Sequence, residues 1–119
     1  MSEPQQMPQD RPVLHVLDVP DLARYEARLG DARELAGIVE YRLRDDFIVL
    51  LHTEVFEGFE GQGIGSRLVR AVLEDLRERE VPALPKCPFI VAWLQKHPEQ
   101  HDILVRPLET PEPDEPSSA

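Results

Sequence analysis

Residues 59–80 read FEGQGIGSRLVRAVLEDLRERE, a glycine-rich loop that runs directly into a helical pattern. Apolar side chains recur there every three or four positions, at Ile64, Leu68, Val69, Val72, Leu73 and Leu76. Charged side chains fill most of the other positions, including Arg67, Arg70, Glu74, Arg77 and Glu78. This period is typical of an amphipathic helix that packs one face on a sheet. We therefore expect a long helix that begins within the glycine loop.

The segments before the loop predict strands. Residues 22–29 and 35–44 alternate between apolar and polar side chains, as half-buried strands do. Residues 47–55 open with five consecutive apolar residues, which indicates a central strand covered on both faces. Two turn-forming pairs separate these segments, Gly30-Asp31 and Asp45-Asp46. The three strands are expected to form an antiparallel meander.

The segments after the helix predict two short strands and a second helix. Residues 81–86 are expected to form a strand, residues 88–98 a second helix, and residues 103–105 a last short strand. The second helix is expected to bury an apolar face made of Phe89, Ile90, Trp93 and Leu94. The order strand-strand-strand-helix-strand-helix predicts an α+β fold, a mixed and mostly antiparallel sheet with helices packed on it.

The composition bounds the class of protein. A chain of 119 residues allows one domain, and its net charge of -10 argues against a basic face for nucleic acid. The single cysteine excludes a disulfide framework and indicates a reducing compartment. No apolar run is long enough to span a bilayer, and the first residues have no apolar core of a signal peptide. We expect a cytoplasmic protein.

Proline and acidic residues concentrate at the two ends of the chain. Residues 107–119 read PLETPEPDEPSSA, with four acids and no base, and residues 1–12 hold three prolines. Neither end has the apolar side chains that would offset the entropy lost on ordering. We expect disordered tails at 1–12 and 107–119 around a folded domain at 13–106.

The glycine loop Gly61-Gln62-Gly63-Ile64-Gly65-Ser66 precedes the free amides of the expected helix. Such amides and the positive end of a helix dipole suit a phosphate group. A dinucleotide-binding motif is excluded because its third glycine position falls on Ser66, and a P-loop because Ile64 and Gly65 stand where Lys and Ser/Thr are needed. A tight turn without a ligand is the alternative.

The loop and its flanks resemble the GNAT superfamily of acyl-CoA N-acyltransferases. The superfamily motif Gln/Arg-x-x-Gly-x-Gly/Ala falls on residues 60–65, with Glu60 in place of Gln or Arg. Two flanking segments extend the similarity to about residues 20–105, namely His52-Thr53-Glu54-Val55 and Pro85-x-Cys87-Pro88-Phe89 with Trp93 and His97-Pro98. The resemblance implies a short, single-domain GNAT-like N-acetyltransferase domain.

This resemblance implies acetyl-CoA as the acyl donor and places it on the chain. The CoA pyrophosphate is expected on the backbone amides of Gly61, Gln62, Gly63, Ile64, Gly65 and Ser66. The pantetheine arm is expected along Thr53, Val55 and Phe56, with the amide of Val55 polarising the acetyl carbonyl. Glu60 adds no cation, so Arg67 or Arg70 would have to balance the phosphates. No set of side chains has metal-ligand spacing, so no metal is expected.

Three residues are candidates for the chemistry of acyl transfer to an amine. Glu54 is either a general base or a solvated acid at the end of its strand. His52 shares its strand parity and is either a base or a structural, hydrogen-bonded histidine. Cys87 is either an acid that protonates the leaving thiol, a nucleophile that relays the acetyl group, or a buried filler. The chain offers no late tyrosine for the acid role, because Tyr25 and Tyr41 are both early.

The acceptor is expected to be a primary amine that reaches an open site. Larger GNAT-like enzymes place helices between their first two strands, whereas here only the turn at residues 30–34 intervenes. This favours an exposed protein lysine or a small polyamine, in an acidic protein that attracts cations. The alternatives are a non-catalytic CoA- or acyl-CoA-binding protein and an interaction module with no ligand. We expect a monomer or a weak dimer.

Overall fold

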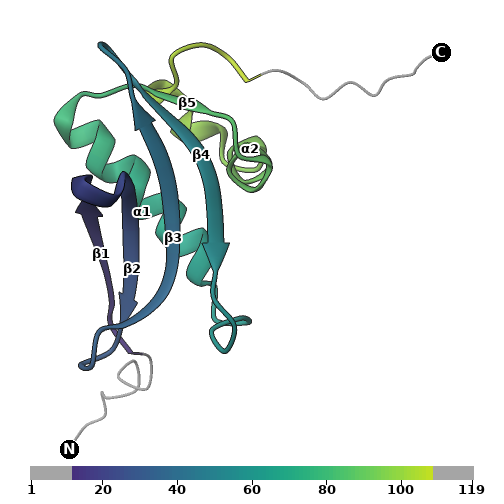
Figure 1. Cartoon of the computed structure of the whole chain (residues 1–119). Coiled ribbons are helices and arrows are strands. Elements are labelled where there is room, and N and C mark those ends of the chain that lie inside the picture. The colour runs from purple at the N-terminus through teal and green to yellow at the C-terminus, as the bar shows by residue number, and fades with distance from the viewer. Residues whose placement is uncertain (1–11, 109–119) are drawn as a thin grey trace, which may run out of the picture.

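The computed structural model describes residues 12–108 and contains one five-stranded sheet within them (Figure 1). The strands follow one another in sheet order as β1 (Leu14–Val19), β2 (Arg24–Leu29), β3 (Glu34–Leu43), β4 (Ile48–Val55) and β5 (Ala83–Pro85). Neighbours from β1 to β4 pair antiparallel, and β5 pairs parallel to β4. The helix α1 (Ile64–Arg79) makes this parallel crossover, and α2 (Pro88–Gln95) follows β5. The predicted α+β class and mostly antiparallel sheet are confirmed.

The strand β1 is absent from the prediction based on the sequence. Its residues, Leu14-His15-Val16-Leu17-Asp18-Val19, lack a clean alternation, and most of them are only half-buried because β1 is an edge strand. The predicted strand at 22–29 also begins too early. Pro20–Leu22 form a 3-10 turn, and Ala23 takes a left-handed φ of 53° before β2 starts at Arg24.

The end of the described chain is also less regular than predicted. Residues Pro98–Ile103 form a 3-10 helix, and Leu104 makes only an isolated parallel bridge to Ala83 instead of a strand. The expected tails lie almost wholly outside the described residues. Between residues 12 and 108, no helix has both the length and the apolar character needed to cross a membrane.

The core lies between α1 and one face of the sheet, as Figure 1 shows with α1 crossing behind the strands. The helical period of the sequence is confirmed, because every apolar position that it predicts on α1 is buried. The sheet contributes Tyr25, Ala27, Val39 and Leu50 to the same cluster. Burying a leucine or valine side chain stabilises the fold by roughly 1.5–3 kcal/mol, so this face of α1 supplies much of the stability.

A bulge in β4 changes which side chains face the core. The register with β3 shifts between Glu40 and Tyr41, so that Tyr41 opposes Leu50 while Glu40 opposes His52. Leu51 is the extra residue, and it is 39% exposed. The expectation that both faces of this strand are covered is therefore wrong at Leu51. Beyond the bulge, odd-numbered residues take the core side, which decides the positions of the candidate site residues.

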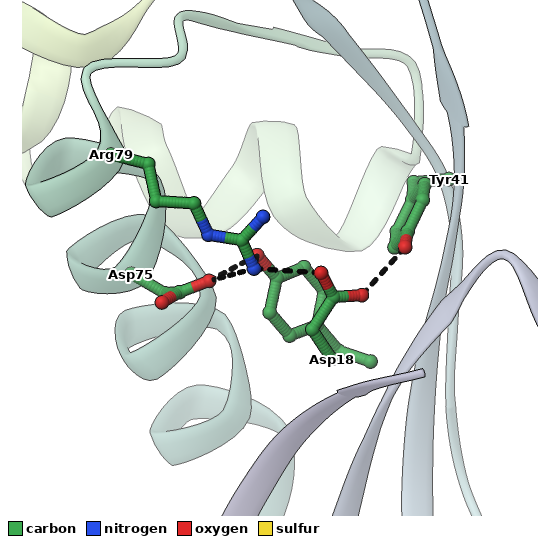
Figure 2. A network of polar contacts seen from close by, with 5 residues as sticks. Asp18, Tyr41, Asp75 and Arg79 are labelled. Carbon is green, nitrogen blue, oxygen red and sulfur yellow. Dashed lines mark hydrogen bonds and ion pairs between the residues drawn. The ribbon is translucent and has the colours of Figure 1, made fainter. Parts of the chain in front are cut away.

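Five residues form a polar network between the C-terminal end of α1 and the first three strands (Figure 2). Tyr25 donates a hydrogen bond to Asp75 at 2.6 Å, and Tyr41 donates one to Asp18 at 2.5 Å. The guanidinium of Arg79 joins the two carboxylates, at 2.6 Å from Asp18 and 2.7 Å from Asp75. Burial and the hydrogen bond to Asp75 raise the pKa of Tyr25 well above its ordinary range, so its hydroxyl stays protonated and donates.

We expect Tyr25→Phe to lower the free energy of unfolding by about 1–2 kcal/mol, because the hydroxyl of Tyr25 is a buried donor to a carboxylate. Urea unfolding followed by circular dichroism measures this loss. Ligand binding at the glycine loop is expected to stay unchanged, since Asp75 lies roughly 17 Å along α1 from its start. A stability equal to that of the wild type would contradict the structural role of the network.

On the other face of the sheet, Glu26 is nearly buried between two arginines. Arg24 donates to its Oε2 at 3.0 and 2.8 Å, and Arg28 donates to its Oε1 at 3.0 Å. Burial works against ionisation of Glu26, but the hydrogen bonds from Arg24 and Arg28 outweigh it and lower the pKa of this carboxyl. The stability that this carboxylate contributes is complete above the unfolded-state pKa of about 4.3 and is lost as the pH falls through the lower pKa of the folded state.

We expect Glu26→Gln to lower the free energy of unfolding near neutral pH by about 2 kcal/mol and to make stability less sensitive to acid. The amide keeps the shape of the side chain but cannot titrate. Urea unfolding measured from neutral pH down to about pH 3 tests this. An equal loss of stability with falling pH in both proteins would show that Glu26 is not the group responsible.

Candidate active site

The strands β4 and β5 part after three paired residues. Their pairing runs from Ile48 with Ala83 to Leu50 with Pro85. The amides of Lys86 and Cys87 then both donate to the carbonyl of Leu50, at 2.8 and 3.2 Å, and the chain turns into α2. Past Leu50, β4 has no strand partner on this edge within the described residues.

Beyond Leu50, the backbone of β4 has hydrogen-bonding groups on the edge where β4 and β5 diverge. The amide of Phe56 donates to the carbonyl of Ala36 at 2.8 Å, so Phe56 directs its backbone towards β3. Hydrogen-bonded and non-bonded pairs alternate along an antiparallel ladder. Glu54 and His52 therefore also direct their backbone to β3, whereas Thr53 and Val55 direct theirs to the edge that β5 has left.

The glycine loop follows β4 and supplies the start of α1. Gly61 and Gly63 have φ values of 81° and 71°, a region that other residues adopt only with strain. A Cβ added at either position would project into open space, with no atom within 4 Å. Gly63 is the N-cap of α1 without a capping side chain, so the amides of the first turn have no intrahelical partners. This turn suits the close approach of an anion.

The predicted loop residues differ in what they expose. Gly61, Gln62 and Gly63 are exposed, whereas the side chain of Ile64 packs in the core. Gly65 is also buried, and a Cβ there would lie 2.8 Å from the ring of Phe89. Ile64 and Gly65 can therefore contact a ligand on the loop only through their backbone. Their burial anchors the helix start under the loop.

Both acidic and basic side chains lie around the loop. Glu60 is exposed, and its Oε1 accepts a hydrogen bond from the amide of Gly58 at 2.9 Å. The Glu60 carboxylate therefore stabilises the loop through a local hydrogen bond. Arg67 is half-buried on α1, and Arg70 lies one turn further along the helix. These two arginines are the cations that the first turns of α1 bring near the loop.

The three candidates for acid-base chemistry lie on the two opposite sides of β4. His52 and Glu54 share the sheet face away from α1, with Nε2 and Oε1 3.5 Å apart and both side chains about half exposed. Thr53 faces the core side, where the Cys87 thiol donates to its Oγ1 at 3.4 Å. Cys87 is 3% exposed, and as the N-cap of α2 it makes no side-chain capping bond. The structure thus brings together two pairs rather than one triad.

Other residues differ from the expectations based on sequence. Phe89 is not a core residue, since it is 46% exposed and lies over Gly65. Trp93 is buried as expected, but its indole also donates to the hydroxyl of Ser66 at 2.8 Å. The helical period of α2 marks Trp93 only as a core position, because nothing near it in the sequence indicates a partner 27 residues away. Tyr25 and Tyr41 both lie in the distant network of Figure 2.

Comparisons with known proteins agree with this arrangement. Residues 24–103 match the family model of the GCN5-related N-acetyl-transferase. Among solved structures, the fold is similar to the NMR structure of a GCN5-like protein from Staphylococcus aureus, with a TM-score of 0.59 and 22% identity. That match covers 85% of this chain and 97% of the other. A comparison with curated proteins gives no significant match.

Proposed function

Because the chain belongs to the GCN5-related N-acetyltransferase family, we propose that it transfers an acetyl group from acetyl-CoA to a primary amine. The observation that carries this proposal is the glycine loop at the start of α1, which follows the part of β4 that β5 leaves unpaired. Acetyl-CoA would supply the thioester whose acyl group is transferred. The residues present fit this donor, since Gly61 and Gly63 leave open the space that a Cβ would fill.

The backbone around the loop and β4 would hold the acyl donor. The amides from Gly61 to Ser66 would bind the pyrophosphate at the positive end of α1. Thr53, Val55 and Phe56 would lie along the pantetheine arm, and the amide of Val55 would polarise the acetyl carbonyl. The amide of Phe56 donates to Ala36 and its carbonyl accepts from the amide of Phe59, so Phe56 would contribute only its side chain. Arg67 would add positive charge near the phosphates.

Calorimetric titration with CoA and with acetyl-CoA tests the first half of the proposal. We expect both to bind the wild-type protein with a stoichiometry of one site. Release of CoA in the presence of a lysine-containing peptide or a polyamine, followed with a thiol reagent, tests the second half. A folded wild-type protein that binds neither ligand would contradict the proposal and leave an interaction module.

The side chains on the two sides of β4 would divide the proton transfers. An attacking amine must be neutral, and the leaving thiolate must be protonated or stabilised. Glu54 would accept the amine proton on the exposed face, with His52 beside it as a second base within 3.5 Å. Cys87 would donate its thiol proton to the leaving sulfur on the core side, because its Sγ–H already acts as a donor to Thr53.

We expect Cys87→Ala to lower kcat for CoA release about tenfold and to leave KM for acetyl-CoA unchanged. The effect is modest because a thiolate, with a parent pKa near 8.5, leaves without full protonation. Cys87→Ser keeps a donor near Thr53 and serves as the matched variant. If both variants turn over like the wild type, Cys87 is a packing residue only.

The acceptor would approach the sheet face that carries His52 and Glu54. The helices α1 and α2 contribute their buried side chains to the opposite side. The turn at residues 30–34, expected to be the first connection between strands, is the second. Because β1 precedes β2, the first connection is instead the 3-10 turn Pro20–Leu22, and it too contains no covering helix. We therefore propose an exposed lysine or a small polyamine as acceptor, and a monomer or weak dimer as the active form.

A second candidate function is binding of CoA or acyl-CoA without turnover. Glu60 places a carboxylate in the loop, and both tyrosines are occupied far from it. These two observations favour a protein that keeps the ligand site but lacks an efficient acid. Binding of acetyl-CoA with no CoA release across lysine peptides and polyamines would establish this candidate.

A further inference from the structure

Trp93 makes a contact with the glycine loop that core packing alone does not require. Trp93 is 6% exposed, and its Nε1 donates to the Ser66 hydroxyl at 2.8 Å. Ser66 is the third residue of α1 and immediately follows Gly65. The contact therefore joins α2 to the first turn of α1, where the amides lack intrahelical partners.

The chemistry of this bond determines the direction of the Ser66 hydroxyl. An indole N–H can only donate, so the Ser66 oxygen must be the acceptor. The hydroxyl proton of Ser66 then remains available to another acceptor. Ser66 is exposed, so this proton can be donated to a ligand that lies on the amides beside it.

The same indole orders a cation. The guanidinium carbon of Arg70 lies 5.2 Å from the centroid of the Trp93 ring. Ser66 and Arg70 are four residues apart on α1 and so share one helical face. Among residues 12–108, no ion pair involves Arg70, which leaves its charge available to an anion.

Trp93 is itself held in one position. The His97 ring stacks on it with centroids 3.8 Å apart and an interplanar angle of 13°. The carbonyl of Trp93 accepts a hydrogen bond from Nδ1 of His97 at 2.7 Å, which requires the proton on that nitrogen. The indole is thus a rigid element, so the groups that it contacts are ordered before any ligand binds.

We infer that Trp93 is a positioning residue for the phosphates of CoA, acting through the Ser66 hydroxyl and the Arg70 guanidinium. The inference rests on the proposed function. It accounts for how a loop that carries Glu60 at the usual Gln or Arg position still balances a pyrophosphate. A hydroxyl donor and a cation would come from α1, both ordered by α2.

The test compares CoA affinities by calorimetry in variants of this contact. Ser66→Ala removes the donor, and we expect CoA to bind about tenfold more weakly. Trp93→Phe keeps an aromatic ring but loses the N–H, and we expect a smaller loss in the same direction. In the double variant the two losses should not add, because both act on one hydroxyl. Ser66→Thr keeps the hydroxyl and should restore the wild-type affinity.

Two controls separate positioning from simple stabilisation. Tyr25→Phe lies in the distant polar network, so it should lower stability without changing CoA affinity. Pantetheine, which has no phosphates, should bind the wild type and Ser66→Ala equally in NMR titrations. If Trp93→Phe fails to fold, the comparison of Ser66→Ala with Ser66→Thr decides alone.

The outcomes distinguish this inference from the proposed function. Unchanged CoA affinity in both Ser66→Ala and Trp93→Phe would overturn the inference and leave the proposed function intact. Equal weakening of CoA and pantetheine binding would overturn it as well, since the effect would then not involve phosphates. A wild type that binds no CoA would overturn both.

Discussion

Gly63→Val is expected to weaken CoA binding about 100-fold or more. Gly63 caps α1 with a φ of 71°, and the space in which a Cβ would lie is open. A valine side chain would occupy the space through which a pyrophosphate reaches the amides of the first turn. Several hydrogen bonds to a charged group would be lost together. Calorimetric titration of the folded variant with CoA measures the effect.

Gly58→Val is the matched control for this substitution. Gly58 also has a positive φ, at 95°, and a Cβ there would likewise meet no atom within 4 Å. Both variants therefore carry a left-handed residue, which costs about 1–2 kcal/mol of stability. Only Gly63 lies at the helix start, so only Gly63→Val should lose CoA. An equal loss in the two variants would mean that backbone strain in the loop, rather than the approach of a ligand, controls affinity.

Glu54→Gln is expected to lower kcat for acetyl transfer to a lysine-containing peptide about 100-fold or more. Glutamine keeps the size of the side chain but cannot accept a proton from the amine. The side chain is about half exposed, so the substitution should leave the fold and the affinity for acetyl-CoA unchanged. Steady-state kinetics should therefore show a lower kcat, while calorimetry should show the wild-type affinity for acetyl-CoA.

Glu40→Gln is the control for the charge of this face. Glu40 lies opposite His52 on β3 and is exposed on the same side of the sheet. The Glu40→Gln substitution removes one negative charge beside the same histidine and leaves Glu54 unchanged, so kcat should stay at the wild-type value. Equal losses in the two variants would assign the effect to the overall charge that attracts a cationic acceptor. Full activity in Glu54→Gln would exclude Glu54 as the base.

The candidate site was predictable from sequence in its parts but not in their arrangement. The loop at residues 61–66 is a local feature, because its glycines and the helix period that follows lie next to one another in the chain. The shared face of His52 and Glu54 also follows from strand parity and is confirmed by their contact. The bond of Cys87 to Thr53 was not predictable, since the two residues lie 34 positions apart.

The sequence by itself determined the elements whose pattern repeats locally: β2 and β3 by alternation, α1 by its apolar stripe, and the glycine loop between β4 and α1. The tertiary structure alone decided the edge strand β1, which has no fully buried residue and no clean alternation in its sequence. It also decided the bulge at Leu51, which reverses the parity of β4 and sets Thr53 against Cys87 but His52 and Glu54 on the open face. The physical reason is that a bulge and a contact such as Trp93 with Ser66 depend on partners distant in the chain, whereas local periodicity depends only on near neighbours.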